Sequence, residues 1–500
     1  MTAAGKAAFP GVPAIVLLAA IGITTVVRAV VAGMTGLTDD EAYYRLLASV
    51  PAMSYVDHPP MAAWMIAAGR FVAGDNPFGI RLCAVLAPLV GFLALWRFAH
   101  ILFGEVVAER AVWFALAMPL LAVGGVVITP DTPSVLFWGL SFWALAELHE
   151  SGNANWWLVV GLCAGLGLLS KYTNLFVGAG IFLWLSLHPA NRRWFFAWQL
   201  WAAGALAVAV AMPVVIWNST HEWASFARQF GRVVKGEGIT LKYLVEVVGA
   251  YLALASPIIA ILALAGCHRV TRALLTAIDP ARLLLAAGIL PLATYFLLHA
   301  LHSRVQPNWM APLYPLLAIC AALAVEHVGR GRPRDGDRHA SRLTEWAAAA
   351  GFCLSALLYW HAVRPLVVLP ETQDPTSQMR GWSTFVGEVE RLKQSSGACW
   401  IATASYATAA QLAYNLPPAI PVLQLTERIR YAHLPRIDAS LFGCQGLYVE
   451  LERRPFLATL RARFSEVVEL AHLRRTYGGE PIAHYVLYRL ARPTGAVLSD

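Results

Sequence analysis

Charged side chains are scarce in this sequence. Only 14% of its 500 residues are Asp, Glu, Lys or Arg, whereas 58% are hydrophobic. A soluble domain has about 25% charged residues, so the composition excludes an ordinary soluble protein and indicates a polytopic membrane protein. The formal charge of +8 does not indicate nucleic acid, because most basic residues lie in short links between apolar runs, where they orient membrane proteins.

Several other signals are missing. None of the seven cysteines has a Cys/His spacing typical of a zinc site, and there is no sustained internal repeat. No small-residue cleavage site follows the first apolar run, so we interpret that run as a retained first span rather than a signal peptide. Cys399 and Cys444 could form a disulfide if their compartment is oxidising, and the other cysteines lie in or beside apolar runs.

The apolar runs predict about eleven transmembrane helices, since a helix needs about 20 residues to cross the membrane. The run 111–149 is about 39 residues, or roughly 58 Å as helix, which is two spans that the prolines at 130–133 separate. The run 156–188 divides likewise at 170–173. The predicted spans are 11–33, 81–103, 111–129, 132–149, 156–170, 172–188, 198–217, 243–266, 282–301, 309–327 and 344–363.

The basic links set the orientation of these spans. Arginines at 192–193, 269–272 and 330–342 fall in alternate links, and the positive-inside rule puts those links in the cytoplasm. The opposite, periplasmic face then receives the loop 34–80, the shorter polar links and everything after 364. The link 218–242 fits poorly, because it carries Arg228, Arg232, Lys235 and Lys242. Either the topology differs there or these cations have a ligand.

The composition changes after residue 364. Segments 381–396 and 407–415 are predicted as helices, and 398–405, 447–451 and 483–490 as strands. Alternating helices and strands indicate a small α/β domain with its own core. We therefore expect an all-α membrane domain over 1–363, with its first periplasmic loop at 34–80, and a periplasmic α/β domain over 364–500.

Three acids, Asp39, Asp40 and Glu41, directly follow the first apolar segment. They form either a solvated turn or a catalytic group. Neighbouring carboxylates repel one another, which raises the pKa of at least one of them and suits a general base. Tyr43 and Tyr44 are expected at the membrane boundary, where aromatic residues gather regardless of function.

Two further acids lie at predicted boundaries on the same face. Asp57 and His58 precede Pro59-Pro60, which stiffens the backbone that presents them. They form either a helix-entry turn or a hydrogen-bonding pair that faces a ligand. Asp131 lies between two Thr-Pro breaks, where it either caps the next helix or serves the site.

Cations and amides complete the candidate set. Lys171, beside Tyr172, interrupts an apolar run, which is costly unless the lysine snorkels or pairs with an anion such as a lipid phosphate. Arg304 has the planar fork that suits phosphate, and Asn308 follows it in the same link. That link could instead be an interfacial anchor.

These motifs resemble one superfamily. They are Asp-Glu-Ala-Tyr-Tyr at 40–44, Tyr-x-Asp-His-Pro-Pro at 55–60, Thr-Pro-Asp-Thr-Pro at 129–133, Leu-Ser-Lys-Tyr-Thr at 169–173 and Pro-Asn-Trp at 307–309. The chain resembles the GT-C glycosyltransferases related to protein O-mannosyltransferases and aminoarabinose transferases, and within them the bacterial lipopolysaccharide galacturonosyltransferase-like branch.

The resemblance implies an inner-membrane enzyme that moves a sugar from a polyprenyl-phosphate carrier to an acceptor hydroxyl on lipid A, lipopolysaccharide core or another glycolipid. It implies that Asp40, accompanied by Glu41, activates the acceptor, and that Asp131 is a second acid of the site. His58 stands where the aminoarabinose branch has lysine, so Lys171 and Arg304 would supply the charge for the phosphate.

Fixed cations could replace a metal at a carrier monophosphate, so we expect no obligatory metal or cofactor. We also expect a monomer that contacts membrane lipids. Two alternatives remain open: an O-mannosyltransferase-type enzyme with a protein acceptor, and a flippase or transporter of a lipid-linked sugar. A purely structural membrane scaffold is the remaining interpretation.

Overall fold

The computed structural model describes residues 14–234, 238–330, 336–454, 456–495 and 497–498. The chain forms two compact units. The helical unit comprises 1–30, 57–62 and 81–359, and the sheet unit comprises 31–56, 63–80 and 360–500. Lys235, one of the cations of the poorly fitting link, lies outside the described residues, as do the side chains of Arg232 and of the basic stretch 330–334.

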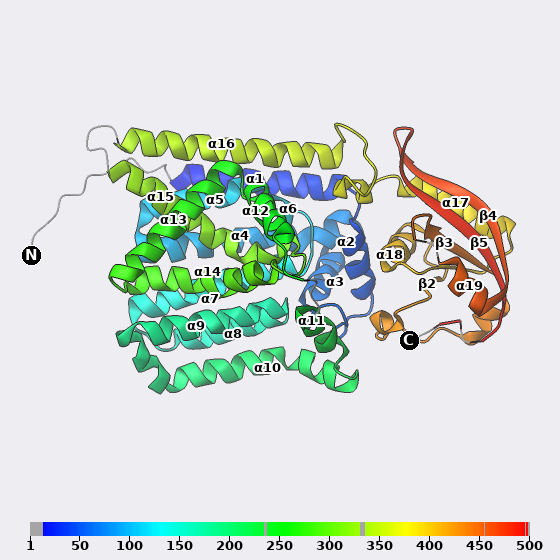
Figure 1. The fold of residues 1–500 in the computed structure, drawn as a ribbon, viewed down its shortest axis with the longest axis horizontal. Coiled ribbons are helices and arrows are strands. Elements are labelled where there is room, and N and C mark those ends of the chain that lie inside the picture. Colours follow the sequence, from blue (N-terminus) through cyan, green and yellow to red (C-terminus); the bar gives the residue numbers. More distant parts are fainter. Residues whose placement is uncertain (1–13, 235–237, 331–335, 455, 496, 499–500) are drawn as a thin grey trace, which may run out of the picture. The chain divides into compact units, whose positions relative to one another are not determined.

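The helical unit consists of long helices that run side by side (Figure 1). The first and last helices of this unit, α1 (Ala14–Met34) and α16 (Gly336–Val363), each have a few residues that belong to the sheet unit, and so does α4 (Pro77–Phe103). The others are α5 (Glu105–Ala117), α6 (Pro119–Gly124), α7 (Asp131–Ser151), α8 (Trp156–Leu168), α9 (Leu175–Leu187), α10 (Trp198–Thr220), α11 (Ala224–Val234), α12 (Lys242–Leu254), α13 (Pro257–Thr276), α14 (Pro280–His299) and α15 (Tyr314–Arg330), with short 3-10 turns η1 (Tyr172–Asn174), η2 (Pro189–Phe196) and η3 (Pro307–Leu313).

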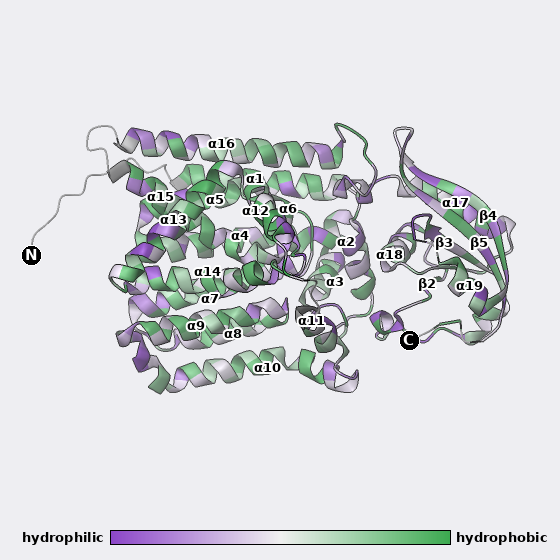
Figure 2. Cartoon of the chain, in the orientation of Figure 1, coloured by the Kyte–Doolittle hydropathy of each residue, from purple (hydrophilic) through white to green (hydrophobic). Residues whose placement is uncertain are grey.

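Seven helical segments in the described part of the chain are long and apolar enough to cross a membrane, or eight if a bent pair counts as one span. Hydrophobic residues occupy most of the length of these helices (Figure 2). The chain is therefore a multi-pass membrane protein, as its composition predicted.

Prolines explain where the observed helices differ from the predicted spans. The predicted span 243–266 is interrupted at Ala255 and Ser256, after which Pro257 begins α13. The predicted span 111–129 is interrupted at Met118, after which Pro119 begins α6. Proline has no N–H to donate and suits the first turn of a new helix, so it favours a break at both places.

The two predicted breaks are confirmed. Helix α7 begins at Asp131, within the Thr-Pro-Asp-Thr-Pro stretch. Helix α8 ends at Leu168 and the 3-10 turn η1 begins at Tyr172. Lys171 lies between them with an extended backbone conformation. Both Asp131 and Lys171 thus lie at the ends of helices rather than in the middle of a span.

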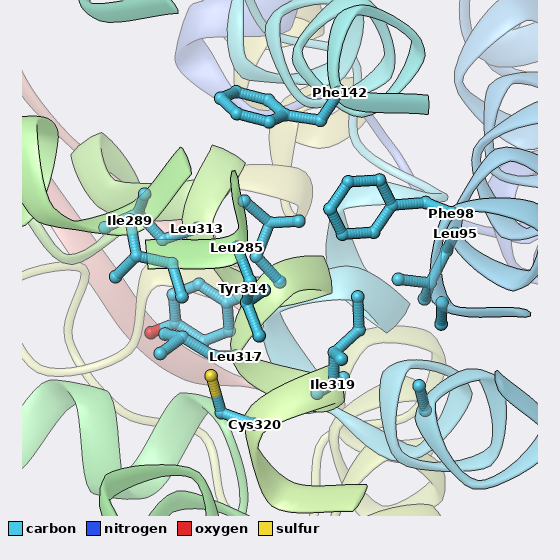
Figure 3. Packing of buried hydrophobic residues seen from close by; sticks show 14 of the residues in the cluster. Leu95, Phe98, Phe142, Leu285, Ile289, Leu313, Tyr314, Leu317, Ile319 and Cys320 are labelled. Carbon is cyan, nitrogen blue, oxygen red and sulfur yellow. The ribbon is translucent and has the colours of Figure 1, made fainter. Parts of the chain in front are cut away.

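The core of the helical unit is apolar and continuous. Side chains of α4, α7, α14 and α15 interdigitate in it, among them Phe98, Phe142, Leu285 and Ile319, all of which are buried (Figure 3). Such close packing holds neighbouring helix ends in fixed positions, and those ends carry the polar side chains described below.

The sheet unit is built on five strands in the order β2-β1-β3-β5-β4. Strand β1 (Trp400–Thr403) pairs in parallel with β2 (Val422–Gln424) and β3 (Gly446–Leu451), whereas β5 (Glu480–Pro493) pairs antiparallel with β3 and with β4 (Phe464–Tyr477). Alternate residues bury on opposite faces. Ile401 packs with helices α17 (Trp382–Ser395) and α18 (Tyr406–Asn415), and Trp400 packs on the other face with α19 (Leu457–Arg463).

All five elements predicted after residue 364 are present as α17, β1, α18, β3 and β5. Strands β2 and β4 were not predicted. Strand β4 lies at an edge of the sheet and most of its residues are at least partly exposed, so it lacks the alternation that reveals a half-buried strand. The possible disulfide between Cys399 and Cys444 is formed.

The acidic segment belongs to the sheet unit. Helix α2 (Asp39–Leu47) packs against α18, although more than 350 residues separate them in the chain. Helix α3 (Met61–Ala73) completes the segment before α4 begins. A Cβ at Gly36, just before α2, would collide with the carbonyl oxygen of Met379, so glycine allows the chain to pass close to that residue.

Candidate active site

The three acids form the first turn of α2. The Thr38 hydroxyl accepts a hydrogen bond from the backbone N–H of Glu41. In return the Glu41 carboxylate accepts from the Thr38 N–H at 3.0 Å and lies 3.2 Å from its hydroxyl. This reciprocal capping starts the helix at a defined residue, so the acids are held in a fixed turn rather than in a solvated loop.

Side chains from the C-terminal part of the sheet unit hold the other two acids. Gln411 donates its amide to Oδ1 of Asp39 at 3.0 Å, and the Asp39 N–H donates to the Gln378 side chain at 3.1 Å. The Tyr406 hydroxyl donates to Oδ1 of Asp40 at 3.1 Å. Each aspartate thus accepts a hydrogen bond from a side chain of the C-terminal segment, which orients its carboxylate.

The pKa of Asp39 is raised to about 6. Burial is the main cause, the hydrogen bond from Gln411 opposes it, and repulsion by Asp40 contributes least. The sequence argument predicted a raised pKa among these acids and attributed it to repulsion. The direction is right and the cause differs, because the packing of α2 against α18 removes water from Asp39.

Tyr44 is buried, with its ring 5.7 Å from that of Tyr43. Tyr43 in turn lies against the ring of Tyr406, 5.1 Å away. The guanidinium of Arg430 lies over both Tyr43 and Tyr406. The aromatic residues after the acids therefore pack within the sheet unit.

In the helical unit, Asp57 is paired with a cation. Nε of Arg228 on α11 lies 2.8 Å from Oδ1 of Asp57, and the side-chain amide of Gln229 donates to the Asp57 carbonyl. Asp57 is buried, while the neighbouring His58 is half-buried. Arg228 belongs to the link whose cations did not fit the predicted orientation, and the structure gives it an acidic partner.

Asp131, Lys171 and Asn308 meet in one buried cluster. Nζ of Lys171 lies 2.6 Å from one carboxylate oxygen of Asp131, and Nδ2 of Asn308 donates to the other at 2.6 Å. Asp131 and Lys171 are 9% and 8% exposed. The Asp131 side chain thus joins three separate chain segments, which goes beyond capping its own helix.

A second contact fixes the same junction. The Asn174 amide donates to the Ser134 hydroxyl at 2.6 Å, so η1 is tied to the first turn of α7 a second time. The neighbouring Tyr172 hydroxyl lies 2.8 Å from that of Ser225, and its ring packs against Phe226 of α11. Lys171 and Tyr172 therefore have well-defined positions.

Arg304 has a different partner. It contacts Glu246 on α12 at 2.9 Å, and its side chain is 74% exposed. The structure thus brings together Asp131, Lys171 and Asn308 of the predicted site, and separately Asp39, Asp40, Glu41 and Tyr44. Within the described residues, no group of three or more His, Cys, Asp or Glu side chains could hold a metal ion.

Sequence reasoning missed Gln411 and Tyr406 as partners of the acids, and Arg430 as the cation over the rings of Tyr43 and Tyr406. They lie in a part of the chain predicted only as ordinary helix and loop, and no local pattern marks them. Arg228 had a signal, because it stood on the wrong face of the predicted topology.

The chain has recognisable relatives. Residues 57–217 match the family described as dolichyl-phosphate-mannose-protein mannosyltransferase. The lipid A galacturonosyltransferase RgtD of Rhizobium johnstonii is 28% identical over 277 residues, which are 55% of this chain and 58% of the relative. The undecaprenyl phosphate-α-4-amino-4-deoxy-L-arabinose arabinosyl transferase of Pseudomonas paraeruginosa is 30% identical over 174 residues, which are 33% of this chain and 30% of the relative. The chain thus spans about half of the first relative and under a third of the second.

Solved structures share the fold. ArnT from Cupriavidus metallidurans in the apo state covers 95% of this chain and 98% of its own, with a TM-score of 0.63 and 14% identity. The same protein bound to undecaprenyl phosphate covers 98% of this chain and 100% of its own, with a TM-score of 0.62 and 13% identity. These likenesses establish a GT-C fold and confirm the resemblance that the motifs indicated. The family match covers His58, Asp131 and Lys171, whereas the acids of α2 lie before it.

Proposed function

We propose, starting from the GT-C fold and the family match over residues 57–217, that this chain is a glycosyltransferase that uses a polyprenyl-phosphate sugar donor. The acceptor is a hydroxyl of lipid A or of another glycolipid. Support for the carrier comes from the related ArnT structure with bound undecaprenyl phosphate, and support for the acceptor from the lipid A galacturonosyltransferase relative.

The buried cluster of Asp131, Lys171 and Asn308 carries this proposal. A lysine in an apolar bundle is costly and marks a functional position when it has an anionic partner. Asp131 pairs with the ammonium and fixes its place, at a helix end that close packing holds. An ammonium has three N–H donors, so Lys171 can hold Asp131 and a phosphate oxygen of the carrier together. Its charge would stabilise the phosphate as it leaves.

The acids of α2 supply the other half of the reaction. The acceptor hydroxyl attacks the anomeric carbon, its proton passes to a carboxylate, and the bond to the carrier phosphate breaks. We propose Asp40 as the general base, because it is exposed and the Tyr406 hydroxyl orients its carboxylate. Glu41 holds the turn that presents Asp40. We propose that Asp39 and Tyr44 line the acceptor side, and that Asp57, His58, Tyr172 and Arg304 help to bind substrate.

We further propose that the chain lies in the bacterial inner membrane as a monomer. Its first loop, 34–80, and its C-terminal domain, 364–500, would then be periplasmic, with the membrane domain at 1–363. This orientation is supported by the arginine-rich links at 192–193 and 269–272, which would be cytoplasmic.

The test is transfer by the purified full chain in detergent. Undecaprenyl phosphate carrying radiolabelled galacturonic acid or 4-amino-4-deoxy-L-arabinose is offered together with lipid A. The proposal expects label on lipid A with release of undecaprenyl phosphate. Asp40→Asn should lower the rate at least about 100-fold, whereas Asp438→Asn, which removes an exposed acid of the same unit, should not. Normal turnover by Asp40→Asn would contradict the assignment of the base.

A protein acceptor is the second candidate, since the matching family is described by protein mannosylation. The same assay distinguishes it, with mannose on the carrier and a Ser/Thr-rich peptide as acceptor. Movement of intact donor across proteoliposomes without any transfer would instead favour a flippase.

A further inference from the structure

One residue that contacts Asp40 comes from the α/β fold of the C-terminal segment. Tyr406 is the first residue of α18 and follows β1 after a two-residue link. Its hydroxyl donates to Oδ1 of Asp40 at 3.1 Å. Burial and the neighbouring Asp40 carboxylate raise the pKa of Tyr406 well above its usual value, so the hydroxyl remains a donor at every physiological pH.

The ring of Tyr406 is clamped. The guanidinium of Arg430 lies 4.7 Å from its centroid, and the ring of Tyr43 meets it at 5.1 Å. Arg430 is only 6% exposed, and its Nε donates to Glu427 at 2.9 Å. Glu427 has φ +50°, which a residue with a side chain adopts only where its surroundings hold it there. The cation therefore has little freedom to leave the ring.

The backbone link before Tyr406 is clamped as well. The Ala404 N–H donates to the buried Glu450 carboxylate at 3.0 Å, and the Ala404 carbonyl accepts from the Gln424 amide at 3.0 Å. Tyr448 donates to the same Glu450 oxygen at 2.9 Å. Gln424 and Glu450 stand at or near the carboxyl ends of β2 and β3, parallel to β1. Functional side chains gather at that edge of a parallel sheet.

These contacts form one continuous support that ends at the Asp40 carboxylate. All of them converge on the link and the ring that place one hydroxyl. A structural contact between two helices would need only apolar packing. Here a hydroxyl donates to the acid proposed as the base, and this hydrogen bond fixes the rotamer of the carboxylate.

We propose that Tyr406 is a positioning residue that orients the Asp40 carboxylate toward the acceptor hydroxyl, so that the C-terminal α/β domain completes the acid site. This inference rests on the proposed function. It assigns to the C-terminal domain a part in the chemical step, whereas binding of the carrier phosphate lies with other residues.

The test is steady-state kinetics of Tyr406→Phe, which removes only the hydroxyl. We expect kcat to fall about tenfold, since a hydrogen bond to a charged group is lost, while the donor KM stays within about twofold. Tyr477→Phe is the matched control, because it removes the hydroxyl of an exposed tyrosine in the same unit. A loss of stability alone would lower the melting temperature and the amount of active protein. The kcat per folded molecule and the donor KM would then stay unchanged.

Arg430→Met provides a second variant should Tyr406→Phe fail to fold. It keeps the packing over Tyr406 and removes the cation, and we expect kcat to fall about threefold with an unchanged donor KM. Unchanged kcat in the folded variants, with Asp40→Asn inactive, would overturn this inference and leave the proposed function standing. Full activity of Asp40→Asn would overturn both.

Discussion

The ion pair between Asp131 and Lys171 allows a quantitative prediction. The two charged atoms are 2.6 Å apart and both side chains are about nine-tenths buried. Removing one member of such a pair leaves the other charge unpaired and costs about 3 to 5 kcal/mol, whereas replacing both is often close to neutral. We therefore expect Asp131→Asn and Lys171→Met to destabilise the protein by about 3 kcal/mol each.

The double variant should be close to neutral and lose clearly less than either single variant, which is a coupling energy of at least about 3 kcal/mol. Unfolding can be followed by tryptophan fluorescence during an SDS titration in mixed micelles, because the chain has 18 tryptophans. The matched control is the pair Arg304 and Glu246, whose 2.9 Å contact is largely exposed. Its coupling should stay below about 1 kcal/mol.

Additive losses at Asp131 and Lys171 would refute this reasoning, since they would mean that the two side chains do not stabilise each other. Activity separates the structural from the chemical role. The double variant should regain stability relative to additivity but remain inactive, because it has no cation for the carrier phosphate. An active double variant would remove Lys171 from the site.

Three further predictions concern other parts of the chain. Asp39→Asn should stabilise the protein by about 2 kcal/mol at pH 7 and by less than about 1 kcal/mol at pH 4. The pKa of Asp39 in the folded protein, about 6, exceeds the ordinary 3.8, so the wild-type protein loses stability as the pH rises between these values. Equal melting temperatures of the variant and the wild type at pH 7 would contradict this. Replacing Cys399 and Cys444 by serine should cost the sheet unit up to about 4 kcal/mol, since the bond closes a loop of 45 residues, and limited proteolysis should then cut that unit sooner. Arg304→Ala should raise the donor KM with little change in stability; an unchanged KM would remove Arg304 from the site.

Most of the helical unit could be predicted because its signals are local. Long apolar runs gave the membrane helices, and the prolines at 130–133 gave the break that places Asp131 at a helix start. The interruption at Ser256-Pro257 had the same kind of signal, but the apolar run across it was long enough to read as one span. Edge strand β4 had no clear alternation, and it was therefore missed.

The sequence predicted several residues of the candidate site but not which of them contact one another, because these contacts join residues far apart in the chain. The pairing of Asp131 with Lys171 joins residues 40 positions apart, and that of Tyr406 with Asp40 joins residues 366 apart. Asp40, Asp131 and Lys171 could be identified because they are charged residues next to or within apolar sequence. Tyr406 and Gln411 lie in an ordinary amphipathic helix, where only the three-dimensional structure distinguishes them from their neighbours.

The most direct test of the central claim is mass spectrometry of lipid A, core oligosaccharide and other glycolipids from cells with and without this gene, complemented by the wild-type chain or by Asp40→Asn. We predict that one glycolipid loses an increment of a single sugar when the gene is absent, that the polyprenyl-phosphate sugar accumulates, and that only the wild-type chain restores the product. An unchanged set of glycolipids, or full restoration by Asp40→Asn, would contradict the account.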